Sequence, residues 1–306
     1  MRRAMRRRRA ALLPPDRGLQ ARMLLAMLSA PAIALGGVAA AILFAPTRVA
    51  VGVGLVLVVG AVRLQGADPP AAPQALAPLE FPAVQPVVER LCVLADLPAP
   101  EIDVQLERRP NSWIEAPSAG RARLHLTTGL LLLLEPDELE AVIAHELSHL
   151  AHHDARVMSL VGGTGDLLVG GAEGTSRWSF VMWPGILAAG AIGWASRLAT
   201  LSFARHRELV ADAGSAALTG RPATLARALR RISGELARVP ALDLRAAVAR
   251  DVLHLLPVGE EAAKAAPLRT HPSLERRIER LERLERARPT RCGAQACGPV
   301  GCPRSL

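Results

Sequence analysis

Long runs without charge dominate the N-terminal part of the chain. After Arg22, the run MLLAMLSAPAIALGGVAAAILFAPT extends to Thr47, and its 25 residues exceed the roughly 20 that a helix needs to cross a bilayer. A second run, Val49–Val62, ends before Arg63. As a helix its 14 residues would measure about 21 Å, which spans a bilayer only if the membrane thins or the Arg63 side chain reaches the interface. We predict a transmembrane helical hairpin over residues 23–63.

Shorter patterns follow this hairpin. The segment 64–86 is predicted to be a stiff linker, because six prolines between Gly66 and Pro86 exclude a regular helix. A helical pattern begins near Val87, and we expect the folded body to occupy 87–290. Three short alternating stretches predict strands: EIDVQLE (101–107), NSWIEA (111–116) and RARLHLT (121–127).

A buried helix is predicted from Pro136 to about His153. Proline suits the first position of a helix, and Asp137 and Glu138 suit its positive N-terminal end. An apolar stripe at helical spacing runs along it: Leu139, Val142, Ile143, Leu147 and Leu150. The predicted fold class is therefore mainly α (α+β), with transmembrane helices and a small β-sheet beside this helix.

Charge changes this picture only at the N-terminus. The chain carries a formal charge of +9, but residues 1–22 hold eight arginines and one aspartate, so that +7 lies there and only +2 elsewhere. Such a near-neutral body excludes a general nucleic-acid-binding protein. By the positive-inside rule, residues 1–22 are expected to be a basic cytoplasmic segment. A secretory signal peptide shares the basic start, but the length of the first apolar run and the presence of a second favour a membrane anchor.

The buried helix contains the pattern H-E-x-x-H, from His145 to His149. Histidines four residues apart share one face of a helix, so both imidazoles can bind one zinc ion. Glu146 is adjacent to His145 and can reach the fourth coordination position, where it can take a proton from zinc-bound water and pass it to the leaving amine. The alternative is a buried helix with two hydrogen-bonded histidines.

The third ligand distinguishes the classes of zinc enzyme. The extended pattern H-E-x-x-H-x-x-G-x-x-H is excluded, because His152 and Ala155 occupy the positions of its glycine and last histidine. A helix predicted over 203–218 offers Glu208, which would complete a His-His-Glu site. Asp212 lies on the same face and would accept a hydrogen bond from a ligating histidine. From its neighbours Arg205 and Arg207 alone, Glu208 fits an exposed carboxylate better than a zinc ligand.

Three segments in a fixed order carry a family resemblance: HELSH (145–149), RELVADAGSAALTG (207–220) and THPSLERRIERL (270–281). They resemble the membrane zinc metallopeptidases (gluzincins) of the HtpX and CAAX prenyl endopeptidase family, HtpX-like branch, and the likeness covers about residues 86–283. The resemblance implies a zincin-type catalytic body with one zinc ion per chain. Its ligands would be His145, His149 and Glu208, with Glu146 as the general base.

The resemblance also implies roles for residues around the zinc ion. Asp212 becomes the partner of a ligating histidine, and Asn111 belongs to an edge strand that binds the substrate backbone. His271 and Arg277 become the pair that stabilises the oxyanion. Because the chain has no tyrosine, no phenol is available for that role. Spacing alone does not decide the role of His271, since a helix cap before Pro272 fits this position equally well.

The chain departs from the family pattern at two places. Ser112-Trp113-Ile114 replaces a more usual run of small residues after Asn111. Glu135 replaces the Ser or Thr that is expected to cap the H-E-x-x-H helix.

A further apolar region separates the two halves of the zinc site. Trp178–Ser196 is uncharged and long enough to span a bilayer, whereas 157–172 contains an aspartate and five glycines. The number of crossings between His149 and Glu208 must be even, since an odd number would put them on opposite sides of the membrane. We expect a second membrane hairpin over 157–196, with a buried or interfacial helical hairpin as the alternative. In either case the site faces the cytoplasm.

The cysteines are not expected to form a site. Cys92 is predicted to be a small buried hydrophobe. Cys292, Cys297 and Cys302 lie in a glycine-containing tail, 291–306, which we expect to be disordered with free thiols, because its spacing lacks the C-x-x-C pairs of a zinc knuckle.

Together these patterns predict a multi-pass zinc endopeptidase of the plasma membrane that hydrolyses peptide bonds with water activated by Glu146. Its partners would be a polypeptide substrate and the lipid bilayer, not nucleic acid. The HtpX resemblance suggests unfolded or damaged membrane proteins as substrates. Two alternatives are a regulatory membrane metallopeptidase that cleaves a signalling or repressor protein, and a non-catalytic zinc-binding scaffold. Glu146 argues against the scaffold, because a structural zinc site needs no base.

Overall fold

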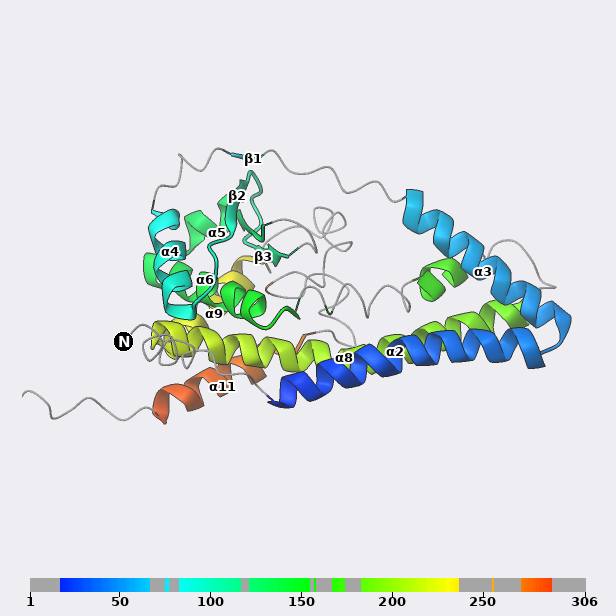
Figure 1. The fold of residues 1–306 in the computed structure, drawn as a ribbon. Helices are drawn as coiled ribbons and strands as arrows, with labels where there is room; N and C mark the ends of the chain where they lie inside the picture. Colours follow the sequence, from blue (N-terminus) through cyan, green and yellow to red (C-terminus); the bar gives the residue numbers. More distant parts are fainter. Residues whose placement is uncertain are drawn as a thin grey trace, which may run out of the picture.

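One helix, α8 (Trp183–Thr219), runs through both halves of the molecule (Figure 1). The structure is a computed structural model, and the residues that it describes are 17–66, 75–76, 83–116, 121–154, 157, 167–173, 183–236, 255 and 271–287. The first half of α8 lies beside two apolar helices, and its second half belongs to a body of helices and a small sheet. A single rigid element therefore joins the apolar helices to the body.

The apolar half contains α2 (Arg17–Phe44) and α3 (Thr47–Gly66), which form the hairpin expected over 23–63. α2 lies antiparallel to α8, and the Ser196 hydroxyl donates a hydrogen bond to the Ala30 carbonyl at 2.8 Å. The same alignment is seen in two buried clusters, one containing Leu19, Ala26, Phe203 and Val210, the other Ala34, Val53, Ile186 and Ala189.

Glycine permits the closest contacts of this bundle. A Cβ added at Gly185 would lie 2.5 Å from the carbonyl oxygen of Val49, and one at Gly171 would lie 2.2 Å from that of Val56. Both distances are far below van der Waals contact, so the backbones approach this closely only because no side chain intervenes. Such packing of small residues is typical of helices that associate in membranes.

Two helices of the described part are long and apolar enough to cross a membrane, α2 and α8. The apolar part of α3, Thr47–Val62, is shorter. Much of the α2 surface is covered by exposed large hydrophobic side chains: Leu24, Leu25, Leu28, Leu35, Leu43 and Phe44. An outward face of this kind is suited to lipid rather than to water.

The region expected to hold a second hairpin is partly described. A short helix occupies 167–173 and packs against α3 and α8, with Leu168 buried in their shared cluster. The helix expected at 203–218 is not separate: it is the second half of α8, which continues from Trp183 without a break. Residues 158–166 and 174–182 lie outside the described part, and the crossing of 157–196 stays a prediction.

A four-stranded mixed sheet lies on one side of the body, with the order β1-β2-β4-β3. Its strands are β1 (Ala75–Leu76), β2 (Glu101–Gln105), β3 (Ser112–Glu115) and β4 (Arg123–Thr127). β2 and β4 are parallel, and the two outer pairs are antiparallel. The three predicted strands are confirmed. The short β1 falls inside the segment predicted as linker, where no alternation announces it.

Five helices complete the body: α4 (Val84–Ala95), α5 (Thr128–Leu133), α6 (Pro136–Ala151), α9 (Pro222–Leu236) and α11 (Leu274–Arg286). α6 is the predicted buried helix, and it contacts α4, α8, α9 and β3. Its apolar stripe joins the inner face of the sheet and α9 in one core, which includes Ile114, Leu124, Leu126, Val142, Ile143, Leu147, Leu225 and Leu229. The mainly α fold with a small sheet beside this helix is as expected.

Two local predictions are decided by the structure. Glu135 begins α6 in a capping box, in which its backbone N–H donates to the Glu138 carboxylate at 3.1 Å. Glutamate thus serves where Ser or Thr was expected. Cys92 is buried in α4 as a free thiol, and burial raises its pKa to about 11, so it is an inert core residue. Cys292, Cys297 and Cys302 lie outside the described residues.

Candidate metal centre

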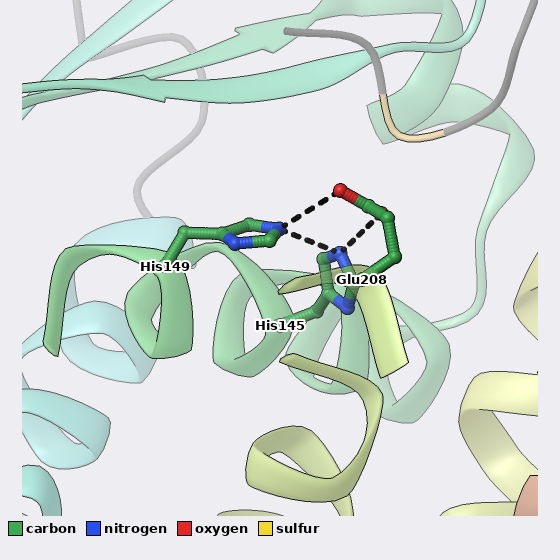
Figure 2. A group of neighbouring side chains, drawn as sticks. All are labelled: His145, His149 and Glu208. Atoms are coloured by element: carbon green, nitrogen blue, oxygen red, sulfur yellow. Dashed lines mark hydrogen bonds and ion pairs between the residues drawn. The ribbon is translucent and has the colours of Figure 1, made fainter. Parts of the chain in front are cut away.

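Three donor side chains converge between α6 and α8 (Figure 2). His145 and His149 come from one face of α6, and Glu208 comes from the second half of α8. The Nε2 atoms of the two histidines are 3.2 Å apart. Glu208 places one carboxylate oxygen 3.7 Å from His145 Nε2 and the other 3.6 Å from His149 Nε2. All three residues are buried, which excludes the exposed carboxylate that the neighbours of Glu208 suggested.

A carboxylate lies at the other ring nitrogen of each histidine. Asp212 Oδ1 is 3.1 Å from His145 Nδ1, and Asp154 Oδ2 is 2.8 Å from His149 Nδ1. A carboxylate at Nδ1 fixes the ring and its tautomer, so that Nε2 is the nitrogen available to a metal ion. The placement of Asp212 agrees with its expected role. Asp154 was not singled out by the sequence, because it follows the end of α6 and reaches His149 through a left-handed turn at His153 (φ 58°).

The donors fit a zinc ion by their chemistry. Two imidazoles and one carboxylate form the donor set of many catalytic zinc sites, and hydrogen-bonded outer nitrogens accompany such sites. Burial alone would lower the pKa of His145, but the carboxylates of Asp212 and Glu208 outweigh this effect and raise the pKa to about 9. A metal ion that binds Nε2 at neutral pH therefore displaces a proton.

Two arginines and one histidine lie around the Glu208 carboxylate. Arg207 donates to Glu208 Oε1 from Nη2 at 2.7 Å and from Nε at 3.2 Å. His271 Nδ1 lies 3.7 Å from Oε2, and Arg277 Nη1 lies 3.5 Å from the same oxygen. The positive charges of Arg207 and Arg277 offset the cost of burying the carboxylate, which would otherwise favour its neutral form.

Arg277 is fully buried, and its guanidinium is directed at Asp212. Nε and Nη2 donate to the two carboxylate oxygens at 2.9 and 2.7 Å, and Nη1 donates to the Leu255 carbonyl at 2.8 Å. Through these contacts the guanidinium group holds the Asp212 carboxylate, which in turn faces His145. These contacts favour a role in holding Asp212 in place, and the oxyanion role that the resemblance implied stays a prediction.

The other two expected site residues, His271 and Asn111, have different surroundings. His271 is buried next to Glu208, and the cap of α11 is Ser273, whose hydroxyl accepts from the Arg276 N–H at 3.3 Å. His271 is therefore not a helix cap. Asn111 precedes β3; its N–H donates to the Thr127 hydroxyl at 2.9 Å, and its Oδ1 accepts from the Leu255 N–H at 3.4 Å.

One contact at the centre was not foreseen. The Ser112 hydroxyl, at the start of β3, donates to Glu146 Oε1 at 2.8 Å. Glu146 itself is buried on α6 between the two histidines in sequence. In the sequence, Ser112 was noted only as part of a departure from the family pattern, and no contact was predicted for it.

The fold and the three-donor centre define a metallopeptidase of the H-E-x-x-H class. The model of peptidase family M48 matches residues 78–285. Protease HtpX homolog 1 of Streptomyces coelicolor is 39% identical over 217 residues, which are 67% of this chain and 71% of the relative. Protease HtpX homolog 2 of Methanosarcina acetivorans is 36% identical over 220 residues, 68% and 74% of the two chains. The chain belongs to peptidase family M48, and it is a metalloprotease.

A solved structure shows a weaker likeness. The crystal structure of S. mikatae Ste24p has a TM-score of 0.41 and 17% sequence identity to this chain, and the match covers 74% of this chain and 55% of that one. The recognition of the HtpX and CAAX endopeptidase family from three sequence motifs is confirmed by the family match.

Proposed function

We propose that this membrane metallopeptidase is a zinc endopeptidase that cleaves unfolded or membrane-proximal polypeptides. The observation that carries the proposal is the convergence of His145, His149 and Glu208, two of which come from the helix that also carries the buried Glu146. One zinc ion per chain would be held by the three donors. Zinc supplies Lewis acidity there, which polarises the scissile carbonyl and lowers the pKa of water.

Glu146 is the proton carrier of the proposed reaction. As the oxygen of water attacks the carbonyl carbon, the Glu146 carboxylate accepts a proton from that water. It then gives the proton to the amide nitrogen as the C–N bond breaks, so the products are a free amine and a carboxylic acid, which loses its remaining proton to solvent at neutral pH. His271, buried beside Glu208, is the proposed donor to the oxyanion. Asp212 and Arg277 hold His145 in place and take no proton.

The substrate is proposed to bind as an added strand. β3 is last in the sheet order, and no described strand pairs with its outer edge. An extended polypeptide could therefore form main-chain hydrogen bonds along β3, whose first residue contacts Glu146. Asn111, directly before β3, would help to hold the substrate backbone. Such binding requires an unfolded segment, and it supports a role in quality control of membrane proteins.

The proposed location is the plasma membrane, with several crossings and a cytoplasmic site. The basic residues before α2 favour a cytoplasmic N-terminus, and the hairpin of α2 and α3 returns the chain to the same side. A regulatory protease of a signalling protein remains an alternative function of the same site.

Cleavage of casein by the full-length chain, purified in detergent with added zinc, tests this function. Glu146→Gln, which keeps the size of the side chain but removes the base, is the matched variant. We expect cleavage by the wild type, at least a hundredfold less by the variant, and one zinc ion bound by each. Equal cleavage by both proteins would refute the role of Glu146, and the absence of bound zinc would refute the site.

A further inference from the structure

Ser112 connects the edge strand to the proposed base. Its hydroxyl donates to Glu146 Oε1 at 2.8 Å across 34 positions of sequence, and its side chain is fully buried. Hydrogen bonds from a hydroxyl to a carboxylate are stronger than those between neutral groups. The contact therefore restrains the rotation of the carboxylate and leaves Oε2 for the proton of water.

The backbone holds Ser112 firmly in this position. Ser112 pairs with Leu126 of β4, and the preceding Asn111 exchanges hydrogen bonds with Thr127: the Asn111 N–H donates to the Thr127 hydroxyl at 2.9 Å, and the Asn111 carbonyl accepts from the Thr127 N–H at 3.1 Å. Alternation along β3 directs the next side chain, Trp113, to the opposite face, where it stacks on His125. Ser112 is thus fixed on the face of the sheet that α6 covers.

Two other buried serines among the described residues behave differently. Ser196 donates to the Ala30 carbonyl at 2.8 Å, and Ser215 donates to the Ala141 carbonyl at 2.7 Å. Both hydroxyls join helices through the backbone, as packing alone requires. Ser112 instead donates to the carboxylate that the proposed mechanism needs, although backbone carbonyls are abundant in a sheet.

We propose that Ser112 is a positioning residue that couples the substrate-binding edge strand to the general base. A substrate that pairs with β3 binds to the strand whose Ser112 holds the Glu146 carboxylate in the orientation for proton transfer. Ser112 keeps its own proton throughout. This inference rests on the proposed function, since it assigns Ser112 a role through Glu146.

The test compares four variants of the full-length protein in the casein assay. Ser112→Ala removes the hydroxyl, and Ser112→Thr restores it on a side chain that strands accommodate well. Ser215→Ala is the matched control, because it removes an equally buried hydroxyl that touches no proposed catalytic group. Glu146→Gln reports on the proposed function itself. Bound zinc and the thermal unfolding midpoint are measured for each.

We expect Ser112→Ala to lower kcat about tenfold or more, with KM changed less than about twofold and one zinc ion still bound. Ser112→Thr should recover most of kcat, and Ser215→Ala should keep the wild-type kcat. Wild-type kcat in Ser112→Ala would overturn the proposal, and so would an equal loss in Ser215→Ala or a failure of Ser112→Thr to restore activity. If the wild type and Glu146→Gln cleave equally, the proposed function fails instead.

Discussion

Replacing Arg277 separates a positioning role from direct stabilisation of the oxyanion. Arg277→Met keeps the length of the side chain but removes two hydrogen bonds to Asp212, at 2.9 and 2.7 Å, and one to the Leu255 carbonyl. Because all of these groups are buried, the Asp212 carboxylate would lose its guanidinium partner and keep only its contact with His145. Loss of one partner of a buried ion pair costs about 3–5 kcal/mol of stability. A misplaced Asp212 would also loosen His145 and weaken zinc affinity about 10- to 100-fold.

The assay measures zinc affinity by competition with a chromophoric chelator, thermal unfolding in detergent, and casein cleavage at saturating zinc. Arg277→Lys keeps the positive charge but loses the paired hydrogen bonds of the guanidinium group. Its zinc affinity and unfolding midpoint should therefore lie between those of the wild type and Arg277→Met. Arg276→Met is the control, since Arg276 is exposed on the same helix. A large loss of kcat with unchanged zinc affinity and unchanged unfolding would refute this reasoning and restore the oxyanion role.

Three further predictions concern the ligands and the helix bundle. Asp154→Asn should weaken zinc binding about 10- to 100-fold in the same chelator competition, because the anchor of the His149 ring is lost; unchanged affinity would contradict this. Zinc binding at pH 7 should release the proton of His145, whose pKa is raised to about 9, so the zinc affinity should rise with pH up to that value. Calorimetry in buffers of different ionisation enthalpy measures this proton release, and binding without proton release would contradict the prediction. Gly185→Ala should destabilise the protein by about 1–3 kcal/mol, whereas Gly36→Ala, with open space around its Cβ, should not; thermal unfolding compares them, and equal midpoints would refute the packing argument.

The parts of the fold that depend on local patterns could be predicted from the sequence. Alternating apolar and polar residues predicted β2, β3 and β4, and the apolar stripe together with H-E-x-x-H predicted α6. The continuity of α8 was missed because Arg197 ends the apolar run, although nothing after it breaks a helix before Gly220. β1 was missed because two residues carry no pattern, and only pairing with β2 defines them.

In the site, too, residues that are close in sequence could be predicted together, whereas contacts between distant segments could not. His145, Glu146 and His149 share one motif on one helix, so their proximity followed from spacing alone. The contact of Asp154 with His149 could not be predicted, because it depends on a left-handed turn after α6. The contact of Ser112 with Glu146 could not be predicted either, because it depends on which strand lies over Glu146. Arg277 was correctly placed near the centre, but the direction of its guanidinium depends on Asp212 of another helix. Contacts that depend on side-chain direction between elements are therefore the ones that sequence alone could not give.

The continuity of α8 leads to a prediction about membrane topology. Glu208 lies 12 residues beyond Ser196, where the uncharged run ends, which is about 18 Å along a helix. Since α2 is antiparallel to α8 and Leu19 packs near Phe203, the start of α2 and the metal centre lie at the same end of the bundle. Phe44, at the other end of α2, is 85% exposed. If the hairpin spans the membrane, the first turn of α2 and the site must face one compartment, and Phe44 must approach the other.

Labelling of single cysteines in intact cells tests this topology. In a chain whose four native cysteines are replaced, Arg17→Cys and Arg221→Cys place exposed thiols at the start of α2 and just beyond the end of α8. Phe44→Cys places one at the opposite end. A membrane-impermeant maleimide should label only Phe44→Cys until the cells are opened, because the basic N-terminus favours the cytoplasm. Labelling of Arg221→Cys and Phe44→Cys from the same side would show that α2 and α8 do not span the membrane as antiparallel neighbours.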